Sequence, residues 1–333
     1  MRPRILVITP VRHIANVPAI LEGIGEVTWL DHPSLAEVTE RIAGYQAIFT
    51  NPNKSNVFLG REVLEAGRDL RVICTASTGT NHIDKALAAS RGVRILALTE
   101  EREFINRISS TAEHAFALMM AALRHIPESF ASVREGEWDY TRFIGRQVDH
   151  LTIGVVGYGR LGGMFARYCR AFGARVLVVD PYKRVEEPGI EQTDLDILLA
   201  EADVISLHVH ATQETQGMVD AGWFARMKPE VLLVNTARGD VVDEVALLAF
   251  LDANPGARLA TDVLANEVRG KGESPLLARA RVSDRILITP HIGGMTREGQ
   301  EIAYGHAAGM LRRFFTDGQG QVTGPSGHAL AAS

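Results

Sequence analysis

The chain has 333 residues, of which 46% are hydrophobic and 23% charged, as in an ordinary globular protein of about two domains. A formal net charge of −5 without a long basic run disfavours nucleic acid or an acidic membrane as a partner. The two cysteines, Cys74 and Cys169, argue against a disulfide scaffold and a structural zinc site, and we expect no metal. No signal peptide or sufficiently long apolar segment is evident, so we expect a cytoplasmic protein.

Short apolar strands and helical patterns alternate over the first hundred residues. The strands are expected at Ile5–Thr9, Glu26–Leu30, Ala47–Thr50, Val72–Thr75 and Val93–Leu96, and the helices around Leu35–Ile42, Val63–Ala66 and Asp84–Ala89. Alternating β and α units predict a parallel sheet covered by helices.

A linking helix is expected at Ser110–Leu123. Ser110 and Glu113 have the spacing of a capping box at its start, and Pro127 follows soon after its end. Its apolar stripe predicts packing between domains or subunits.

A strand, a glycine-rich turn, a helix and a second strand come next. The strand Ile153–Val156 leads into Gly157, Gly159 and Gly162, which have G-x-G-x-x-G spacing. The first glycine permits the tight turn, the second lets a pyrophosphate approach the backbone, and the third lets the helix pack on the strand. Asp180 ends the second strand, where its carboxylate can accept from both ribose hydroxyls and would repel a 2′-phosphate. The sequence therefore predicts an NAD site.

The remainder of the chain continues this pattern. Further strands are expected at Val204–Leu207, Val231–Val234, Ala257–Ala260 and Ile286–Ile288, with helices at Ala221–Met227 and Val245–Ala253 and a last helix at about Thr296–Phe315. We therefore predict an α/β protein of two doubly wound parallel-sheet domains. One is an NAD-binding Rossmann domain at 106–295, and the other a smaller, discontinuous flavodoxin-like substrate domain at 1–105 plus 296–333. The tail from Thr316 is expected to be disordered.

Polar residues follow four strands of the second domain directly. They are His208, Arg238, Asp262 with Glu267, and His291. Ligands of such sheets bind outside the carboxyl ends of the strands. A guanidinium there can hold a carboxylate and polarise a keto oxygen, and a histidine oriented by a carboxylate can exchange the proton. Each residue alone has an ordinary structural explanation, but the combination favours hydride transfer to a 2-keto acid.

The chain up to about residue 315 resembles the D-isomer-specific 2-hydroxyacid dehydrogenase family, and within it the D-3-phosphoglycerate dehydrogenase branch. The matching segments are STGTNHID at 77–84, STAEH at 110–114, GVVGYGRLGG at 154–163 with Asp180, NTARGDVVDE at 235–244, the Asp262 and Glu267 pair, and TPHIGG at 289–294. The resemblance implies that Arg238, Glu267 and His291 are catalytic, with His291 as acid and base.

The resemblance also implies binding residues and an assembly. Cofactor contacts are expected at Gly157, Gly159, Arg160, Leu161, Gly162, Asp180, Thr111, His208, Ala237, Asp262 and Gly294, with Asp262 matched to the acid that contacts the nicotinamide carboxamide. The substrate is expected to contact Arg238 and the Ser77, Thr78 and Gly79 loop. The family is typically a homodimer or tetramer, and we expect a homodimer. We also expect the substrate cleft to close by hinging near residues 105 and 296.

The specific substrate is left open by the sequence. Asn51 stands nearest to the position where the phosphoglycerate branch carries an arginine for the phosphate, and Lys54 could supply a positive charge instead. His210 also replaces a proline that is usual in the family. Two alternative functions remain, namely an NAD-sensing binding protein or corepressor, and a dehydrogenase of formate or phosphite.

Overall fold

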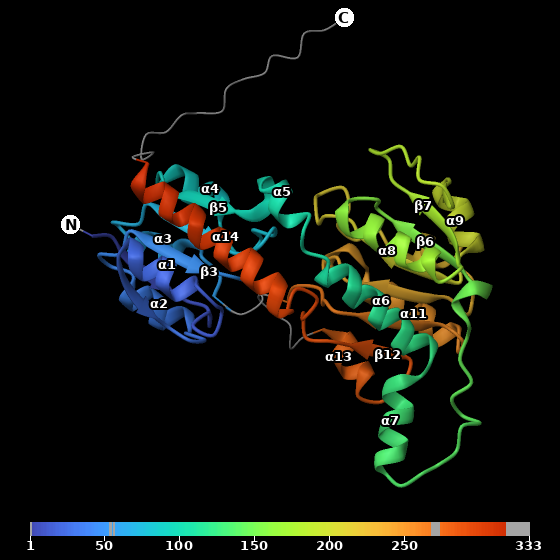
Figure 1. Cartoon of the computed structure of the whole chain (residues 1–333). Helices are drawn as coiled ribbons and strands as arrows, with labels where there is room; N and C mark the ends of the chain where they lie inside the picture. The colour runs from blue at the N-terminus through green and yellow to red at the C-terminus, as the bar shows by residue number, and fades with distance from the viewer. Residues whose placement is uncertain (1, 53–54, 56, 268–273, 318–333) are drawn as a thin grey trace, which may run out of the picture. The chain divides into compact units, whose positions relative to one another are not determined.

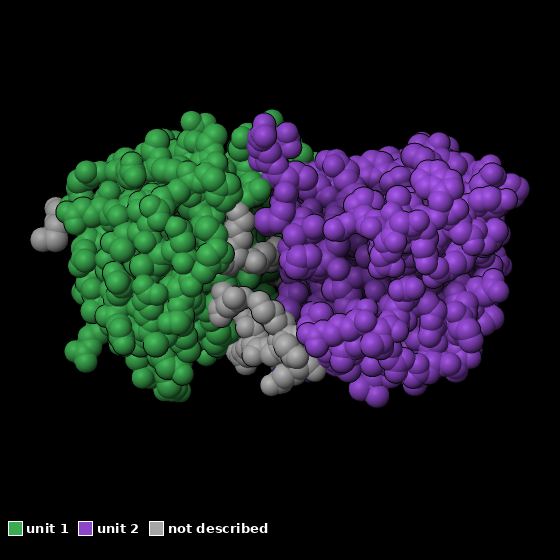
Figure 2. Space-filling view, turned by 90° about the horizontal axis from the view of Figure 1, so that it is seen from below, with its two compact units in different colours: residues 1–107, 300–333 green, residues 108–299 purple. Residues whose placement is uncertain are grey.

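Two compact units make up the chain. The computed structural model describes residues 2–52, 55, 57–267 and 274–317. One unit comprises residues 1–107 and 300–333, and the other comprises residues 108–299 (Figure 2). The chain returns to the first unit through α14 (Arg297–Thr316), so the first unit is built from both ends of the chain.

The first unit contains a five-stranded parallel sheet. Its strands are β1 (Arg4–Val7), β2 (Glu26–Trp29), β3 (Ala47–Thr50), β4 (Val72–Thr75) and β5 (Arg94–Ala97). They lie in the order β2-β1-β3-β4-β5 and every pair is parallel. This is the strand order of flavodoxin-like sheets, which confirms the fold class predicted for this part of the chain.

Helices cover both faces of this sheet (Figure 1). On one face, α1 (Val17–Ile24) and α14 bury Leu21, Tyr304 and Leu311 against β1, β3 and β4. On the other face pack α2 (Leu35–Arg41), α3 (Arg61–Ala66) and α4 (Lys85–Ser90). The short α5 (Arg102–Ile105) follows β5. The inner strands β1, β3 and β4 are buried on both sides, which explains their continuous apolar character.

The second unit contains a seven-stranded parallel sheet. Its strands are β6 (Thr152–Val156), β7 (Arg175–Val179), β8 (Ile190–Gln192), β9 (Val204–Leu207), β10 (Leu232–Asn235), β11 (Arg258–Thr261) and β12 (Ile286–Ile288). Their order, β12-β11-β10-β9-β6-β7-β8, contains the Rossmann arrangement and confirms that prediction. The order reverses between β6 and β9, where ligands of such sheets bind.

Two layers of helices enclose this sheet as well. One face is covered by α6 (Ser110–Leu123) and α8 (Arg160–Ala171). The other carries α9 (Leu195–Glu201), α10 (Ala221–Phe224), α11 (Glu244–Ala253) and α13 (Pro275–Ala280). A further helix, α7 (Ile126–Arg134), projects from the rest of this unit (Figure 1).

Two expectations about α6 were wrong. The helix begins at Ser110, and Glu113 pairs with the preceding Ser109, whose hydroxyl donates to its carboxylate at 2.5 Å. The Ser110 hydroxyl is hydrogen-bonded instead to that of Thr296 at 2.7 Å. The apolar stripe of α6, with Leu118 and Met119, is buried in the core of the second unit rather than between domains or subunits. Its helical periodicity therefore reports packing on the unit's own sheet.

The described residues include no helix that is long and apolar enough to cross a membrane. Within the same residues, His, Cys, Asp and Glu side chains form no group of three that could hold a metal ion.

Candidate active site

The glycine turn joins β6 to α8 in a conformation that needs glycine. Gly157 has φ +91°, a left-handed conformation that side chains rarely adopt. A Cβ on Gly162 would overlap the carbonyl oxygen of Gly157, so only glycine lets α8 start this close to the turn. No heavy atom lies within 4 Å of the place where a Cβ of Gly159 would stand. The turn therefore leaves open space beside the N-terminus of α8, where Arg160 and Leu161 form the first turn of the helix.

Asp180 follows β7 directly and is held beside this turn. Its Oδ2 accepts a hydrogen bond from the backbone N–H of Tyr158 at 2.7 Å, and its Oδ1 accepts one from Tyr182 at 2.9 Å. Next to it lies a surface pocket of about 560 Å³, lined by Val179–Pro181 and Gln192–Leu195. A glycine turn, a helix N-terminus and a fixed carboxylate at the strand ends fit the phosphates and ribose of a dinucleotide.

Three further predicted cofactor contacts come from different elements: Thr111 from the start of α6, Arg160 from the start of α8 and Gly294 from the loop after β12. The Arg160 guanidinium donates to the carbonyl oxygen of Ile108, and burial lowers its pKa. Thr111 lies in the first turn of α6, close to Gly293. A Cβ added to Gly293 would stand 3.3 Å from the methyl group of Thr111. At Gly294 the corresponding position has no heavy atom within 4 Å.

His208 and Ala237 follow the neighbouring strands β9 and β10. Burial lowers the pKa of His208 to about 3, so the ring is neutral at physiological pH. Its Nε2 lies 2.9 Å from the Ser206 hydroxyl, and its ring packs against Phe165 with centroids 5.0 Å apart. A neutral, packed imidazole of this kind can line a cofactor site without adding charge.

Arg238 lies at the carboxyl end of β10 and is largely buried. Burial lowers the pKa of its guanidinium, while the negative charges of Glu267 and Asp240 act in the opposite direction. Its Nη1 donates to the carbonyl oxygen of Ala237 at 2.6 Å. A Cβ on the next residue, Gly239, would overlap the backbone of Leu264, so this glycine lets the Arg238 loop touch the loop that leads to Glu267.

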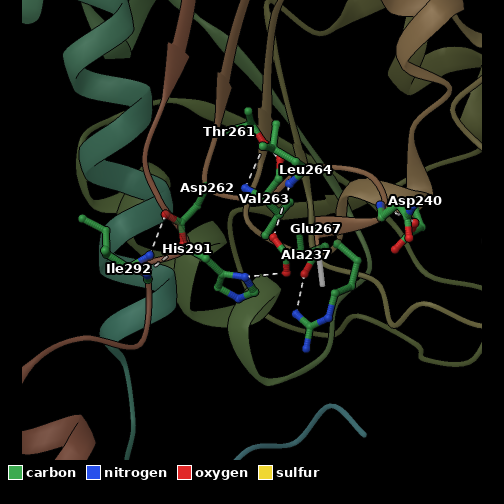
Figure 3. A network of polar contacts seen from close by, with 12 residues as sticks. Ala237, Asp240, Thr261, Asp262, Val263, Leu264, Glu267, His291 and Ile292 are labelled. Carbon is green, nitrogen blue, oxygen red and sulfur yellow. Dashed lines mark hydrogen bonds and ion pairs between the residues drawn. The ribbon is translucent and has the colours of Figure 1, made fainter. Parts of the chain in front are cut away.

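Glu267 and His291 form a direct pair at the ends of the adjacent strands β11 and β12. The distance from His291 Nδ1 to Glu267 Oε1 is 2.6 Å, and the two side chains are 19% and 20% exposed. Figure 3 shows the imidazole turned toward this carboxylate. A carboxylate accepts at Nδ1, so that nitrogen carries a proton and Nε2 is left for a substrate. His291 has φ +55°, an uncommon value for a residue other than glycine.

Asp262 is a buried carboxylate at the end of β11. Burial alone would raise its pKa, but hydrogen bonds from His114, Thr289 and the backbone N–H groups of Ile292 and Gly293 outweigh burial and hold the pKa below its usual value. Asp262 is therefore a permanent negative charge at neutral pH, close to the Glu267 and His291 pair (Figure 3).

The proposed substrate loop lies after β4 in the first unit. The Ser77 hydroxyl donates to the carbonyl oxygen of Gly79 at 2.7 Å, and Thr78 accepts from the Thr99 hydroxyl through its carbonyl oxygen at 2.7 Å. These bonds fix the loop at the carboxyl edge of its own sheet. Asn51, also on this edge, is 4% exposed and donates through its side-chain amide to the carbonyl oxygen of Ala76 at 2.8 Å. Lys54 lies outside the described residues.

The second unit thus brings together residues that are far apart in its sequence. Arg238, Asp262, Glu267 and His291 all lie at the carboxyl ends of β10, β11 and β12, as expected from the strand pattern. The sequence reasoning assigned no role to His114 or Thr289, which both contact the Asp262 cluster. The STAEH segment that contains His114 was the available signal, but only the packing of α6 shows its partner.

Comparison with known proteins identifies the family. Residues 116–293 match the model of the D-isomer specific 2-hydroxyacid dehydrogenase, NAD binding domain. The chain is 38% identical over 270 residues to a D-3-phosphoglycerate dehydrogenase of Archaeoglobus fulgidus, which covers 80% of this chain and 49% of that protein. It is 34% identical over 244 residues to a hydroxypyruvate reductase of Thermotoga maritima, with 72% of this chain and 76% of the relative covered.

Solved structures agree with the fold. The crystal structure of a D-lactate dehydrogenase from Aquifex aeolicus, complexed with NAD and lactic acid, matches with a TM-score of 0.77 and 27% identity. The match covers 93% of this chain and 95% of that one. The chain spans about half the length of the D-3-phosphoglycerate dehydrogenases that it matches.

Proposed function

The chain belongs to the D-isomer-specific 2-hydroxyacid dehydrogenase family, and we propose that it interconverts a D-2-hydroxy acid and its 2-keto acid with NAD. The observation that carries this proposal is the 2.6 Å pair of Glu267 and His291 together with the partly buried Arg238. The three side chains supply a cation for the substrate, a proton donor and the anion that stabilises the donor when charged.

We propose that residues 108–299 bind the cofactor and that residues 1–107 with 300–333 bind the substrate. The glycine turn and Asp180 would hold the dinucleotide, with contacts from Arg160, Leu161, Thr111, His208, Ala237, Asp262 and Gly294. The loop Ser77–Gly79 would supply backbone N–H groups to the substrate carboxylate. The fixed backbone of that loop supports this role, because preorganised donors need no reordering when the anion binds.

The proposed chemistry divides the work among three side chains. When bound, NADH supplies the hydride that the substrate carbon accepts. The guanidinium of Arg238 donates to the substrate carboxylate and to the keto oxygen, and so stabilises negative charge that develops on this oxygen. His291 gives the oxygen its proton from Nε2, and the Glu267 carboxylate stabilises the imidazolium before the transfer. In the oxidative direction the same imidazole takes up the hydroxyl proton.

The identity of the substrate's side group is a separate question. We propose that a doubly charged substrate is bound if Lys54 supplies the positive charge for its second anionic group. The buried Asn51 amide already donates within its own unit, so it does not replace the cationic group of the phosphoglycerate branch. A panel of 2-keto acids with NADH, including phosphorylated and phosphonate members, would measure the preference through the NADH absorbance. Strong preference for doubly charged anions that disappears in Lys54→Ala would identify this lysine as a specificity residue.

The same panel separates the alternatives. Reduction of one or more 2-keto acids, abolished in His291→Ala while NADH still binds, is the expected result. Binding of NADH without turnover of any member would favour an NAD-sensing protein. Oxidation of formate or phosphite with NAD, and no reduction of keto acids, would favour the third candidate.

We infer that the chain forms a homodimer through the projecting α7 segment. Phe130, Trp138, Tyr140 and Ile144 on α7 and the chain after it are 64%, 91%, 83% and 76% exposed. The base of α7 is nevertheless fixed, because Glu128 pairs with Arg258 at 2.5 Å between side chains that are 14% and 17% exposed. We call residues 126–144 the arm. Exposed aromatic side chains on a segment whose base is anchored in this way are typical of an interface.

Measurement of molar mass by light scattering would test this assembly. Trp138→Ser combined with Tyr140→Ser in the arm should convert a dimer into a monomer, whereas Val245→Ser, at a 74% exposed position on α11, should not. A wild-type chain that is monomeric at high concentration would refute the inference.

A further inference from the structure

One carboxylate holds both ends of the turn that carries His291. Asp262 Oδ1 accepts from the Thr289 hydroxyl at 2.5 Å and from the Ile292 N–H at 2.9 Å, and Oδ2 accepts from the Gly293 N–H at 2.7 Å. These donors lie within two residues of His291 on either side in the sequence. Figure 3 shows Asp262 bonded to Ile292 on the side of the turn opposite the Glu267 pair.

His114 completes this cluster from α6. Its Nε2 lies 2.9 Å from the Thr289 hydroxyl oxygen and 3.3 Å from Asp262 Oδ1, and its side chain is 18% exposed. The Thr289 hydroxyl has one proton, which it donates to Asp262 over the shorter distance, so its oxygen accepts from His114. His114 therefore carries a proton on Nε2 and supports the Thr289 side chain beside its bond to Asp262.

The turn needs such support because its backbone is unusual. His291 has a left-handed conformation, and a Cβ on Gly293 would stand 3.0 Å from Asp262 Oδ2. A residue other than glycine persists in this region of φ and ψ only when the surrounding structure over-determines it. The donors that converge on Asp262 provide that constraint.

We propose that His114 is a positioning residue for His291. Through Thr289 and Asp262 it holds the 289–293 turn, and the turn determines where Nε2 of His291 lies. Loss of the His114 donor removes its contacts with the Thr289 hydroxyl oxygen and with Asp262, and so weakens one end of the turn. The catalytic consequence rests on the function proposed above, because a proton donor displaced by an ångström transfers its proton far less often. The constraint on the turn itself requires neither substrate nor cofactor.

Two substitutions at one position test the proposal. His114→Leu removes the donor, whereas His114→Gln places an amide N–H at a reach similar to that of Nε2. In the whole chain without ligand, the amide hydrogens of Ile292 and Gly293 should exchange about tenfold faster in His114→Leu, and at close to the wild-type rate in His114→Gln. His150→Leu, on an exposed short helix, is the matched control and should leave both rates unchanged.

Kinetics then connect the turn to the reaction. With a 2-keto acid that the wild type reduces, kcat should fall about tenfold in His114→Leu while the Kd of NADH, measured by fluorescence, stays within about threefold. Substitution by glutamine should restore most of kcat, which a purely structural role would not predict.

Three results would overturn the proposal. They are unchanged amide exchange in His114→Leu, faster exchange with an unchanged kcat, and equal losses in the leucine and glutamine variants. A wild-type chain that reduces no 2-keto acid would refute the proposed function instead, and the exchange rates would still decide whether His114 holds the turn.

Discussion

The pair of Glu267 and His291 gives the sharpest test of the proposed chemistry. Glu267→Gln keeps the size of the side chain and a group that can contact Nδ1, but removes the negative charge. The imidazolium that forms before proton transfer then lacks its anion. The bond is short and both side chains are about four-fifths shielded from solvent, so solvent screening is modest. The variant should therefore bind NADH normally and fail in turnover.

The expected size of the loss in kcat/KM follows from the strength of a charge-assisted hydrogen bond. Such a bond contributes about 1.5–3 kcal/mol, which corresponds to a loss of about 10- to 150-fold in kcat/KM. The assay is keto-acid reduction followed by NADH absorbance, together with fluorescence titration of NADH. Glu65→Gln is the control, because it removes the same charge from an ion pair with Arg61 on the exposed face of α3. That change should leave kcat/KM within about twofold, since an exposed pair of this kind contributes only about 0.3–0.5 kcal/mol.

A loss below threefold in Glu267→Gln, with NADH binding intact, would refute the role of the carboxylate. A loss of NADH affinity equal to the loss in kcat/KM would place Glu267 in cofactor binding rather than in proton transfer.

Three further predictions concern the cofactor half of the chain. Asp180→Ser should lower the preference for NAD over NADP by about tenfold or more, because it removes a negative charge from beside the 2′-phosphate; an unchanged ratio of kcat/KM values would contradict this. Gly162→Ala should cost about 1–3 kcal/mol of unfolding free energy through overlap with Gly157 and abolish NADH binding, whereas Gly305→Ala in α14, with nothing within 4 Å of the new methyl group, should preserve both. The pKa of His208 is lowered to about 3 in the folded chain. As the pH falls below about 6.5, His208 therefore binds a proton in the unfolded chain before it does so in the folded chain, and the folded state loses up to about 1.4 kcal/mol of stability per pH unit. Thermal unfolding of His208→Gln should therefore depend less on pH between about 6.5 and 4, and an equally steep decline in the variant would refute the role of burial.

The sequence predicted most strands because they are apolar and the inner ones are buried on both faces; it did not predict β8, whose Glu191 and Gln192 are exposed. Ala47–Thr50, Val72–Thr75, Val204–Leu207 and Ile286–Ile288 have the bounds that the structure gives to β3, β4, β9 and β12. Such strands read as unbroken apolar runs, whatever their neighbours are.

The sequence missed α1, α7, α9 and α13, and two of these, α1 and α7, have local signals that obscure them. Pro127 follows the end of α6 as expected, but it also lies in the first turn of α7, where proline is tolerated because the backbone N–H that it lacks would have no partner within the helix. In α1, Asn16 precedes the helix in a left-handed conformation and two glycines lie close to its end, so the helix is short and weakly marked. Packing against the sheet, through Val17 and Leu21, stabilises it instead.

The candidate site was predictable to the extent that it depends on strand order. Parallel pairing of β11 with β12 aligns Thr261 with Ile288, so the residues that follow the two strands must lie side by side. This brings Glu267 near His291 although 24 positions separate them. The contact of His114 with Asp262 depends instead on how α6 docks across the sheet, which no local pattern records.

The same pair of residue types occurs a second time, which shows what distinguishes a catalytic histidine from a structural one. His306 Nε2 lies 2.6 Å from Glu101 Oε2 in the first unit, the same separation as in the His291 pair. Yet His306 is only 6% exposed, lies within α14, and its ring packs on Phe104 with centroids 3.7 Å apart. The pair that it forms ties α14 to the chain after β5. His291 instead follows a strand on a left-handed turn, with its pair formed through Nδ1. The charge of its partner Glu267 raises the pKa of the partly buried Arg238 guanidinium. The short bond alone therefore does not distinguish the two histidines. Position at the strand ends and a neighbouring cation, together with that bond, support the catalytic role proposed for His291.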